Sequence, residues 1–458
     1  MHALRLKFQS LSRAGFLRSV GVLVGGTAIA QALSVLVLPV VTRLYTPADF
    51  SVLAVYSGIL VIISVVACLR LEIAIPMPQR DEDAANLLAL ALCSCTAVAA
   101  LTALVIWWFP SQIVSLLGQP GLRPFLWLLP PGIWLSSAYA AVQFWAMRKK
   151  RFTNIAKTRM TQAVGGASAQ LGLGWFTALG PFGLLMGQAI SSGAGLFGLG
   201  RAALQEDRAA LRSINRPSMY RIFRDYDRFP KYSTLEAFAN NAAIQLPIII
   251  IASMAIGPDA GYLLLATRAM AVPMGLIGGA ISQVYLSRAP DEMRAGHLAA
   301  FTVKIIGGLA KSGVGPLIFI GIVSPVLFPL IFGKNWQRAG ELVAWMTPWF
   351  IAQFLASPVS MALHVTDNQR AALNLQIFGL ILRVGTVIFI GWLARDYIVE
   401  AYALTGLIFY IIYFIVVVRF TQIKFKDLIY NYKLVHIIII IWTILGVISF
   451  FIINEINK

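Results

Sequence analysis

A permanent cation, Arg383, stands in the middle of the otherwise neutral stretch FGLILRVGTVIF. Arg268 and Lys311 also interrupt apolar stretches. A charge at the centre of a bilayer costs at least about 2.5–3.5 kcal/mol, so such residues usually serve a function. Either buried carboxylates neutralise them, or an anion does so from outside the protein. Nearly all of the 19 Asp and Glu residues fall between the apolar stretches or at their ends. We therefore predict that Arg383 and Arg268 line a hydrated cavity that receives an anion.

Uncharged polar residues favour the same cavity. Gln31 lies in the first apolar stretch, and Asn240, Asn241 and Gln245 lie close together in a later one. A single amide commonly pairs two helices, but this later group exceeds what helix pairing usually requires. We therefore predict that these amides are cavity residues, suited to hydroxyl groups.

A membrane-spanning scaffold must position these residues. The chain is 59% hydrophobic and only 12% charged, against about 25% charged in soluble proteins. Apolar windows of about 20 residues, enough to cross about 30 Å of hydrocarbon as helix, recur along it. Continuous runs such as LPIIIIASMAI exclude the alternation of barrel strands. The sequence predicts an all-α polytopic membrane protein with thirteen spans: 16–41, 48–69, 84–108, 123–146, 155–178, 182–200, 235–256, 260–286, 305–331, 340–364, 371–393, 398–418 and 434–453.

The basic residues are unevenly distributed between the two sides that alternating spans would create. Most of the 37 Lys and Arg residues share the side of the basic N-terminus, as in the connection MRKKRFTNIAKTR. This bias follows the positive-inside rule and predicts a cytoplasmic N-terminus. It also explains the net charge of +18 through topology and anionic lipid, with no nucleic-acid partner.

Two halves are separated by the longest inner connection, residues 201–234, which is either an amphipathic helix on the inner leaflet or a solvated basic loop. The first outer turns of the halves, YTPADFSVLAVYS and IGPDAGYLLLATR, are alike, with Pro47 matching Pro258. We predict two six-helix bundles in a parallel repeat, as in several transporters. The expected parts are an N-terminal bundle (1–200), a linker (201–234), a C-terminal bundle (235–420), and a basic loop with an extra span (421–458).

Several kinds of chemistry lack their residues. No G-x-x-x-x-G-K-[ST] phosphate loop occurs, which excludes ATP hydrolysis by this chain. The three cysteines all lie within spans and the four histidines are scattered, so we expect neither disulfide nor metal site. Outer connections are short, leaving no room for a catalytic loop. We expect no catalytic residues and no cofactor.

Three segments carry a family resemblance: TRLYTPADF (42–50), LRLEIAIPMP (69–78) and LFPLIFGKNWQRAG (327–340). They resemble parts of polysaccharide-exporting flippases of the O-antigen (Wzx) type, in the multidrug/oligosaccharidyl-lipid/polysaccharide (MOP) exporter superfamily. The resemblance is sharp from Gly25 to Asn86. It implies two six-helix bundles around a central cavity, here with an additional C-terminal span.

The resemblance also implies a function. Such proteins move undecaprenyl-diphosphate-linked oligosaccharide from the cytoplasmic to the periplasmic leaflet of the bacterial inner membrane by alternating access. Arg383 and Arg268 would then meet the diphosphate, and the amides would meet sugar hydroxyls. Lys311 and Arg159, near the inner mouth, would attract the head group. Expected partners are membrane lipids, and candidate partners are a glycan polymerase and a chain-length regulator.

Two other functions are considered. A multidrug cation antiporter of the same superfamily would favour cavity carboxylates, but the first span contains no Asp or Glu. A membrane glycan polymerase or ligase would need catalytic groups on a large loop. Both are less consistent with the residues than a flippase.

Overall fold

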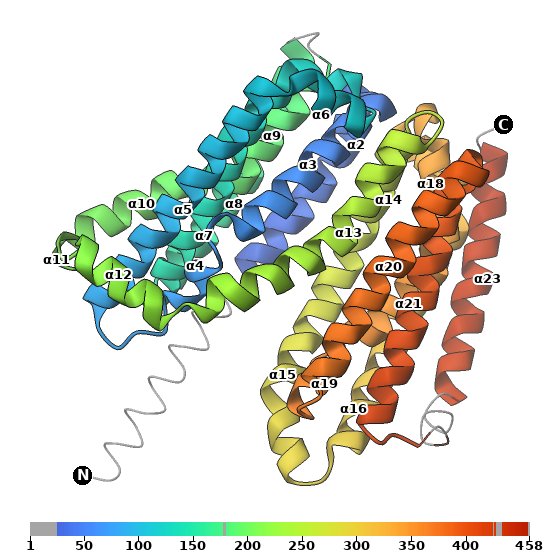
Figure 1. Ribbon diagram of the computed structural model, residues 1–458. Helices are drawn as coiled ribbons and strands as arrows, with labels where there is room; N and C mark the ends of the chain where they lie inside the picture. The colour runs from blue at the N-terminus through green and yellow to red at the C-terminus, as the bar shows by residue number, and fades with distance from the viewer. Residues whose placement is uncertain (1–24, 177–179, 425, 427–432, 457–458) are drawn as a thin grey trace. The chain divides into compact units, whose positions relative to one another are not determined.

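The computed structural model describes residues 25–176, 180–424, 426 and 433–456. Within these ranges the regular structure is entirely helical (Figure 1). In this described part of the chain, eleven helical segments are long and apolar enough to cross a membrane. These observations confirm the all-α polytopic class.

The number of candidate spans differs from the thirteen predicted, because 155–178 and 260–286 do not reappear among the eleven. The first of these windows forms most of helix α8 (Phe152–Phe176), in which apolar residues alternate with Gly, Gln and Ser. The second window is divided among α14 (Asp259–Pro273), the π-helical turn η3 (Met274–Gly278) and α15 (Gly279–Arg294).

The chain divides into two compact units. Unit 1 comprises residues 1–44 and 56–241, and unit 2 comprises residues 45–55 and 242–458. Helices α3 (Pro47–Ala67) and α13 (Thr234–Met254) therefore each contribute residues to both units.

Unit 1 is an all-helical bundle with a helical linker at its C-terminal end. Besides most of α3, its elements are α2 (Leu38–Leu44), α4 (Leu71–Ala74), α5 (Asp81–Trp108), α6 (Pro110–Leu117), η1 (Pro120–Leu128), α7 (Leu129–Arg148), α8, α9 (Phe182–Gly193), α10 (Gly195–Glu206), α11 (Arg208–Arg212), α12 (Arg216–Asp225) and η2 (Phe229–Ser233). Small residues allow α8 and α9 to pack closely: a Cβ placed on Gly187 would lie 2.7 Å from the Gly166 carbonyl oxygen.

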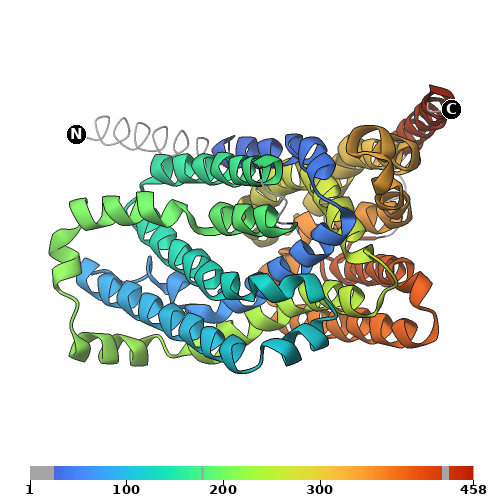
Figure 2. The same cartoon turned by 90° about the horizontal axis from the view of Figure 1, so that it is seen from above.

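Unit 2 is also a helical bundle. Besides most of α13, its elements are α14, η3, α15, α16 (Leu298–Leu309), η4 (Ala310–Val314), α17 (Gly315–Phe332), η5 (Lys334–Trp336), α18 (Gln337–Ala356), η6 (Ser357–Val359), α19 (Ala362–Val365), α20 (Gln369–Leu393), η7 (Arg395–Tyr397), α21 (Ile398–Phe420) and α23 (Lys433–Ile456). The last helix, α23, lies at the margin of unit 2 in both views (Figures 1 and 2).

Helix α23 packs against α17 through one strip of residues. The Trp442 ring covers Gly315, where an added Cβ would lie 2.2 Å from the indole, and it meets Phe319 edge-on at 5.7 Å. The rest of the helix is apolar and open, so only 6% of its spanning window is buried inside the protein. Its sequence and its exposure both indicate that it faces lipid.

The start of α3 illustrates how a sequence motif fixes local structure. In TRLYTPADF, the Thr46 hydroxyl accepts a hydrogen bond from the Asp49 backbone N–H (3.2 Å). In return, the Asp49 carboxylate accepts one from the Thr46 backbone N–H (2.9 Å). This reciprocal pair is a capping box with Asp in place of Glu, and Pro47 occupies the first helical position that suits it. The motif therefore begins the helix sharply.

Candidate functional site

Arg383 lies on α20 inside unit 2, enclosed by aromatic rings. Its guanidinium carbon is 4.3 Å from the centroid of Phe409, 5.5 Å from Tyr410 and 5.9 Å from Trp349. Helices α18 and α21 supply the rings, and only 5% of Arg383 is exposed. We call Arg383 and these three aromatic residues the arginine cage.

The arginine cage contains N–H groups without acceptors. Among the described residues, the Nε and Nη2 atoms of Arg383 and the Nε1 atom of Trp349 are buried with no hydrogen-bond partner. No acidic side chain in the described ranges forms an ion pair with Arg383. The rings contribute cation–π attraction of about 0.5–2 kcal/mol each, but they cannot accept all of these N–H groups. The cage is thus chemically suited to an anion.

Arg159, the predicted cation of unit 1, is half-buried on α8. Its Nη2 donates to the side-chain oxygen of Gln143 on α7 at 3.1 Å, and its Nε is buried without a partner among the described residues. Gln143 is neutral, so the hydrogen bond holds the guanidinium without neutralising it.

The other two predicted cations belong to unit 2. Arg268 is half-buried on α14, whereas Lys311 is exposed on η4. The exposed residues Lys304, Gly308 and Lys311 lie at helical spacing, so they share one face of the α16–η4 segment. Lys311 stands within a π-helical turn, a feature often found at functional sites.

The predicted amides are partly solvent-accessible. Gln31 and Asn240 are exposed, and Gln245 is half-buried. Asn241 donates from its side chain to the Ala237 carbonyl at 2.9 Å. Unit 1 contains Gln31, Asn240 and Asn241, together with Arg159; unit 2 contains Gln245 with the other three cations. The grouping of all eight residues in one cavity remains a prediction.

Two of the sequence motifs meet inside unit 2. The Phe50 ring of TRLYTPADF lies edge-on to Trp336 of LFPLIFGKNWQRAG, with 4.7 Å between centroids, and Tyr262 contacts the same indole at 6.0 Å. The Ser51 hydroxyl accepts a hydrogen bond from the Gly261 backbone N–H at 2.8 Å. We call these five residues the motif junction. It brings together the two turns whose likeness suggested a repeat.

An ion-pair group adjoins the motif junction. Arg338 contacts carboxylates from three helices: Glu400 on α21, Glu341 on α18 at 3.5 Å and Asp259 on α14 at 3.9 Å. Sequence reasoning missed both groupings. The two motifs were a signal for the motif junction, but they meet only through tertiary contacts, such as Phe50 with Trp336, between residues more than 200 positions apart.

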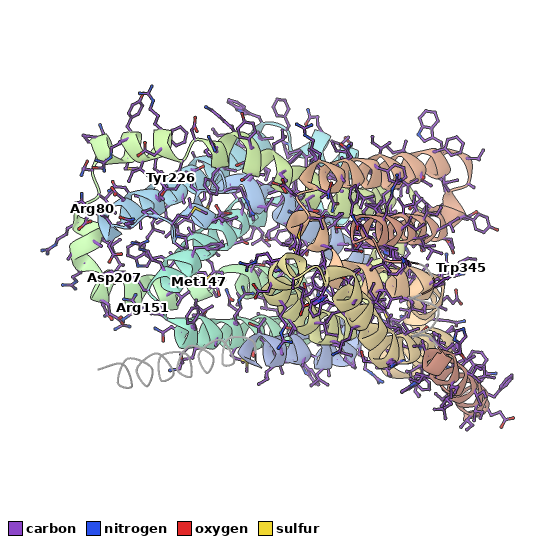
Figure 3. The ribbon with its side chains drawn as sticks, turned by 90° about the horizontal axis from the view of Figure 1, so that it is seen from below. Arg80, Met147, Arg151, Asp207, Tyr226 and Trp345 are labelled. Atoms are coloured by element: carbon purple, nitrogen blue, oxygen red, sulfur yellow. The ribbon has the colours of Figure 1, made fainter. Side chains whose placement is uncertain are left out.

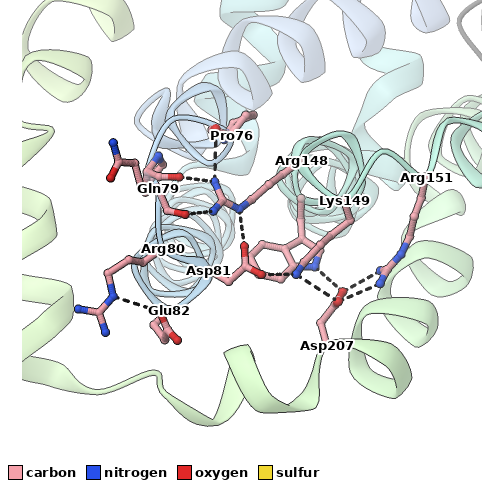
Figure 4. Close-up of polar contacts among 11 residues, drawn as sticks. Pro76, Gln79, Arg80, Asp81, Glu82, Arg148, Lys149, Arg151 and Asp207 are labelled. Atoms are coloured by element: carbon pink, nitrogen blue, oxygen red, sulfur yellow. Dashed lines mark hydrogen bonds and ion pairs between the residues drawn. The ribbon is translucent and has the colours of Figure 1, made fainter. Parts of the chain in front are cut away.

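A second polar network was also missed and lies at the end of unit 1 where α5 begins and α7 ends (Figure 4). Arg148 Nε donates to Asp81 at 2.9 Å, and its Nη1 donates to the Pro78 carbonyl at 2.6 Å. Lys149 pairs with Asp81 at 2.6 Å and with Asp207 at 3.6 Å. The MRKKR segment therefore joins neighbouring helices, in addition to supplying positive charge.

Asp207 anchors the linker of unit 1 to this network. Both of its oxygens accept from Arg151, at 2.7 and 2.8 Å, and one also accepts from the indole of Trp145 at 2.8 Å. Figure 3 shows Arg151 and Asp207 side by side. Burial would raise the pKa of Asp207, but the hydrogen bonds from Arg151 and Trp145 outweigh it and hold the pKa below its ordinary value.

We predict that Asp207→Asn lowers the stability of the protein by about 1–3 kcal/mol near neutral pH, because buried donors lose a charged acceptor. A lowered native pKa stabilises the fold above the unfolded-state pKa, and this stability is lost as pH falls through the native value. The difference between wild type and variant should therefore shrink in acid. Thermal unfolding across a pH series measures it, with the exposed Asp225→Asn as the control. A constant difference would contradict the prediction.

Comparisons with known proteins address the fold and the family. The structure is similar to the lipid II flippase MurJ in an inward closed conformation, with a TM-score of 0.71 and 12% identity over 94% of this chain and 98% of that one. It is also similar to a mutant of the Vibrio cholerae MATE transporter VcmN, with a TM-score of 0.55 and 13% identity over 89% of this chain and 95% of that one. A eukaryotic MATE transporter, AtDTX14, is similar with a TM-score of 0.51 and 14% identity over 91% of this chain and 100% of that one. At these identities the likeness shows a shared fold.

The sequence itself gives the family. No curated protein matches it. The sequence profile of a family described as polysaccharide biosynthesis protein matches residues 40–341, well over half of the 458-residue chain. The matched range includes all three motif segments and both turns of the motif junction. The chain belongs to this polysaccharide biosynthesis protein family.

Proposed function

We propose that the protein is a flippase for lipid-linked oligosaccharide. It moves an undecaprenyl-diphosphate-linked repeat unit of a surface polysaccharide, such as O-antigen, from the cytoplasmic to the periplasmic leaflet of the bacterial inner membrane. The family, the helical transporter fold and the suitability of the arginine cage for anions support this proposal. The chain acts as a transporter, without catalysis.

The observation that carries the proposal is the arginine cage. Removing a cation from water costs several kcal/mol unless a counter-charge repays it. The described part of the chain provides no carboxylate for Arg383, so the counter-charge arrives with the cargo. A diphosphate fits, because guanidinium N–H groups form strong, directional bonds with phosphate oxygens.

The other cations have supporting roles in this mechanism. The N-terminus is cytoplasmic, and Arg159 and Lys311 attract the anionic head group before Arg268 and Arg383 neutralise it. Gln31, Asn240, Asn241 and Gln245 accept and donate hydrogen bonds to sugar hydroxyls. The polyprenyl tail remains in the surrounding lipid, and a polymerase with a chain-length regulator uses the exported unit.

Deletion of the gene in its native host tests the function. Lipid-linked oligosaccharide should accumulate on the cytoplasmic leaflet while surface polysaccharide disappears, and a plasmid copy should restore export. Leaflet location can be read by periplasmic access of a lectin or glycosidase to spheroplasts. Unchanged surface polysaccharide, or accumulation on the periplasmic leaflet, would contradict a flippase and favour a role after translocation.

A further inference from the structure

The segment LRLEIAIPMP contains a backbone turn that the proposed function does not use. Leu69 and Arg70 follow α3 with φ values of +53° and +57°, a left-handed conformation in which non-glycine residues are uncommon. Such a residue costs about 1–3 kcal/mol and persists where the surroundings enforce it, often at functional positions. The turn brings Arg70 Nη1 to 3.4 Å from Glu72 Oε1.

Glu72 is buried and incompletely paired. It is 5% exposed, at the start of α4, between α5 and α7 of unit 1. Its Oε2 atom and the Nε atom of Arg70 are both buried with no hydrogen-bond partner among the described residues. Arg70 is half-buried, and a single long contact that leaves a donor and an acceptor unused does not repay the desolvation of the buried carboxylate. The pair can therefore exchange its ionised form for a neutral carboxyl.

The charged and titratable groups around Glu72 leave Arg70 as its cationic partner in the described ranges. On α7, Arg148 is already bound to Asp81 and to the Pro78 carbonyl. On η2, Lys231 is paired with Asp227. The Cys68 thiol, which precedes the turn, donates to the Ser137 carbonyl at 3.4 Å, and Cys95 lies on α5.

Burial is the dominant influence on Glu72 and raises its pKa above the ordinary value. Its own backbone hydrogen bond and the charge of Arg70 only partly oppose this rise. The direction agrees with the geometry, because a pocket that offers Oε2 no hydrogen-bond donor penalises the carboxylate more than the neutral acid.

We propose that the Arg70–Glu72 turn is a proton-binding site. The proton binds at the free Oε2 of Glu72, the carboxyl becomes neutral, and Arg70 loses its ion-pair partner. Release of the proton restores the pair. This inference does not depend on the identity of the cargo, and it gives the protein a group through which a proton gradient could be coupled to movement.

Infrared difference spectroscopy of the purified full-length protein in lipid vesicles tests the site. The C=O stretch of a protonated carboxyl should appear as the pH is lowered, and Glu72→Gln should remove one such band. Asp259→Asn, which alters another buried acid paired with Arg338, is the matched control and should leave that band in place. A titrating band that is unchanged in Glu72→Gln would overturn the proposal.

A measurement on Arg70→Gln keeps the test decisive if Glu72→Gln folds poorly, and a comparison of thermal stabilities adds to the test where Glu72→Gln folds. Arg70→Gln should move the titration of the Glu72 band to higher pH, since a favourable charge on the carboxylate is removed. A carboxyl with a raised native pKa stabilises the fold at low pH, and this contribution is lost as pH rises through that value. Thermal stability of the wild type should therefore fall more steeply with pH than that of Glu72→Gln. Identical slopes, or no shift in Arg70→Gln, would refute the site, and neither result bears on export.

Discussion

Arg383→Ala should abolish surface polysaccharide in a host that depends on this protein, while membrane insertion and expression remain normal. Loss of a charge-assisted hydrogen bond worth about 1.5–3 kcal/mol predicts at least a roughly tenfold fall in export. Surface glycan is measured by gel electrophoresis or by lectin binding to whole cells. The expected defect is in function, because the fold does not use Arg383 to balance an acid in the described ranges.

Two substitutions at the same position separate charge from packing. Arg383→Lys keeps a cation among the rings and should retain part of the export. Arg383→Met fills the arginine cage without charge, so it should export as poorly as Arg383→Ala. Its stability should stay close to that of the wild type, because the lost cation–π attraction is offset by the removal of two buried N–H-bearing atoms without partners. Normal export by Arg383→Met would show that the arginine cage has no part in transport.

Gly261→Ala should destabilise the protein and reduce export, although alanine is the better helix former. A Cβ at this position would lie 2.0 Å from the Pro47 carbonyl oxygen and 2.9 Å from the Ser51 backbone nitrogen. Both neighbours are backbone atoms at the start of α3, where the capping box fixes the turn. Overpacking of this kind costs about 1–3 kcal/mol, which exceeds the helix-propensity gain of about 1 kcal/mol. Thermal unfolding of the purified protein measures the loss.

Gly385→Ala is the matched control for this prediction. Gly385 lies within α20, and an added Cβ would have no neighbour within 4 Å. The same chemical change should therefore be neutral or stabilising by about 0.4–1 kcal/mol, through helix propensity and the entropy of the unfolded chain. Equal stability of the two variants would mean that the turns of the motif junction do not pack as described.

Much of the fold could be predicted from the sequence because the bilayer imposes length and apolarity on each span. Those constraints act locally, so the apolar windows identified the helical class. The polar residues of α8 lower its mean hydropathy, so that this helix is absent from the eleven candidate spans although it is 25 residues long. Tertiary packing, which hydropathy does not measure, stabilises such a helix.

The candidate site was less accessible to sequence reasoning. The charge of Arg383 and its lack of an acidic neighbour in sequence were evident, but its aromatic enclosure depends on Trp349 and Phe409 from two other helices. The prediction of a hydrated setting remains untested. Glu72 was not distinguished from the other acids that lie between the apolar stretches or at their ends, because burial of a carboxylate and strain at Leu69 are properties of the folded chain.

The contact of α23 with α17 along one strip affects how the protein can be handled. A helix that touches its own bundle along one strip is held in place by the surrounding lipid as much as by protein contacts. Its position therefore depends on the detergent or lipid that replaces the bilayer during purification. Mild, long-chain detergents or nanodiscs preserve that environment. Harsh micelles compete directly for the isoleucine-rich surface that α23 presents, and the carboxyl-terminal segment would be the first to separate.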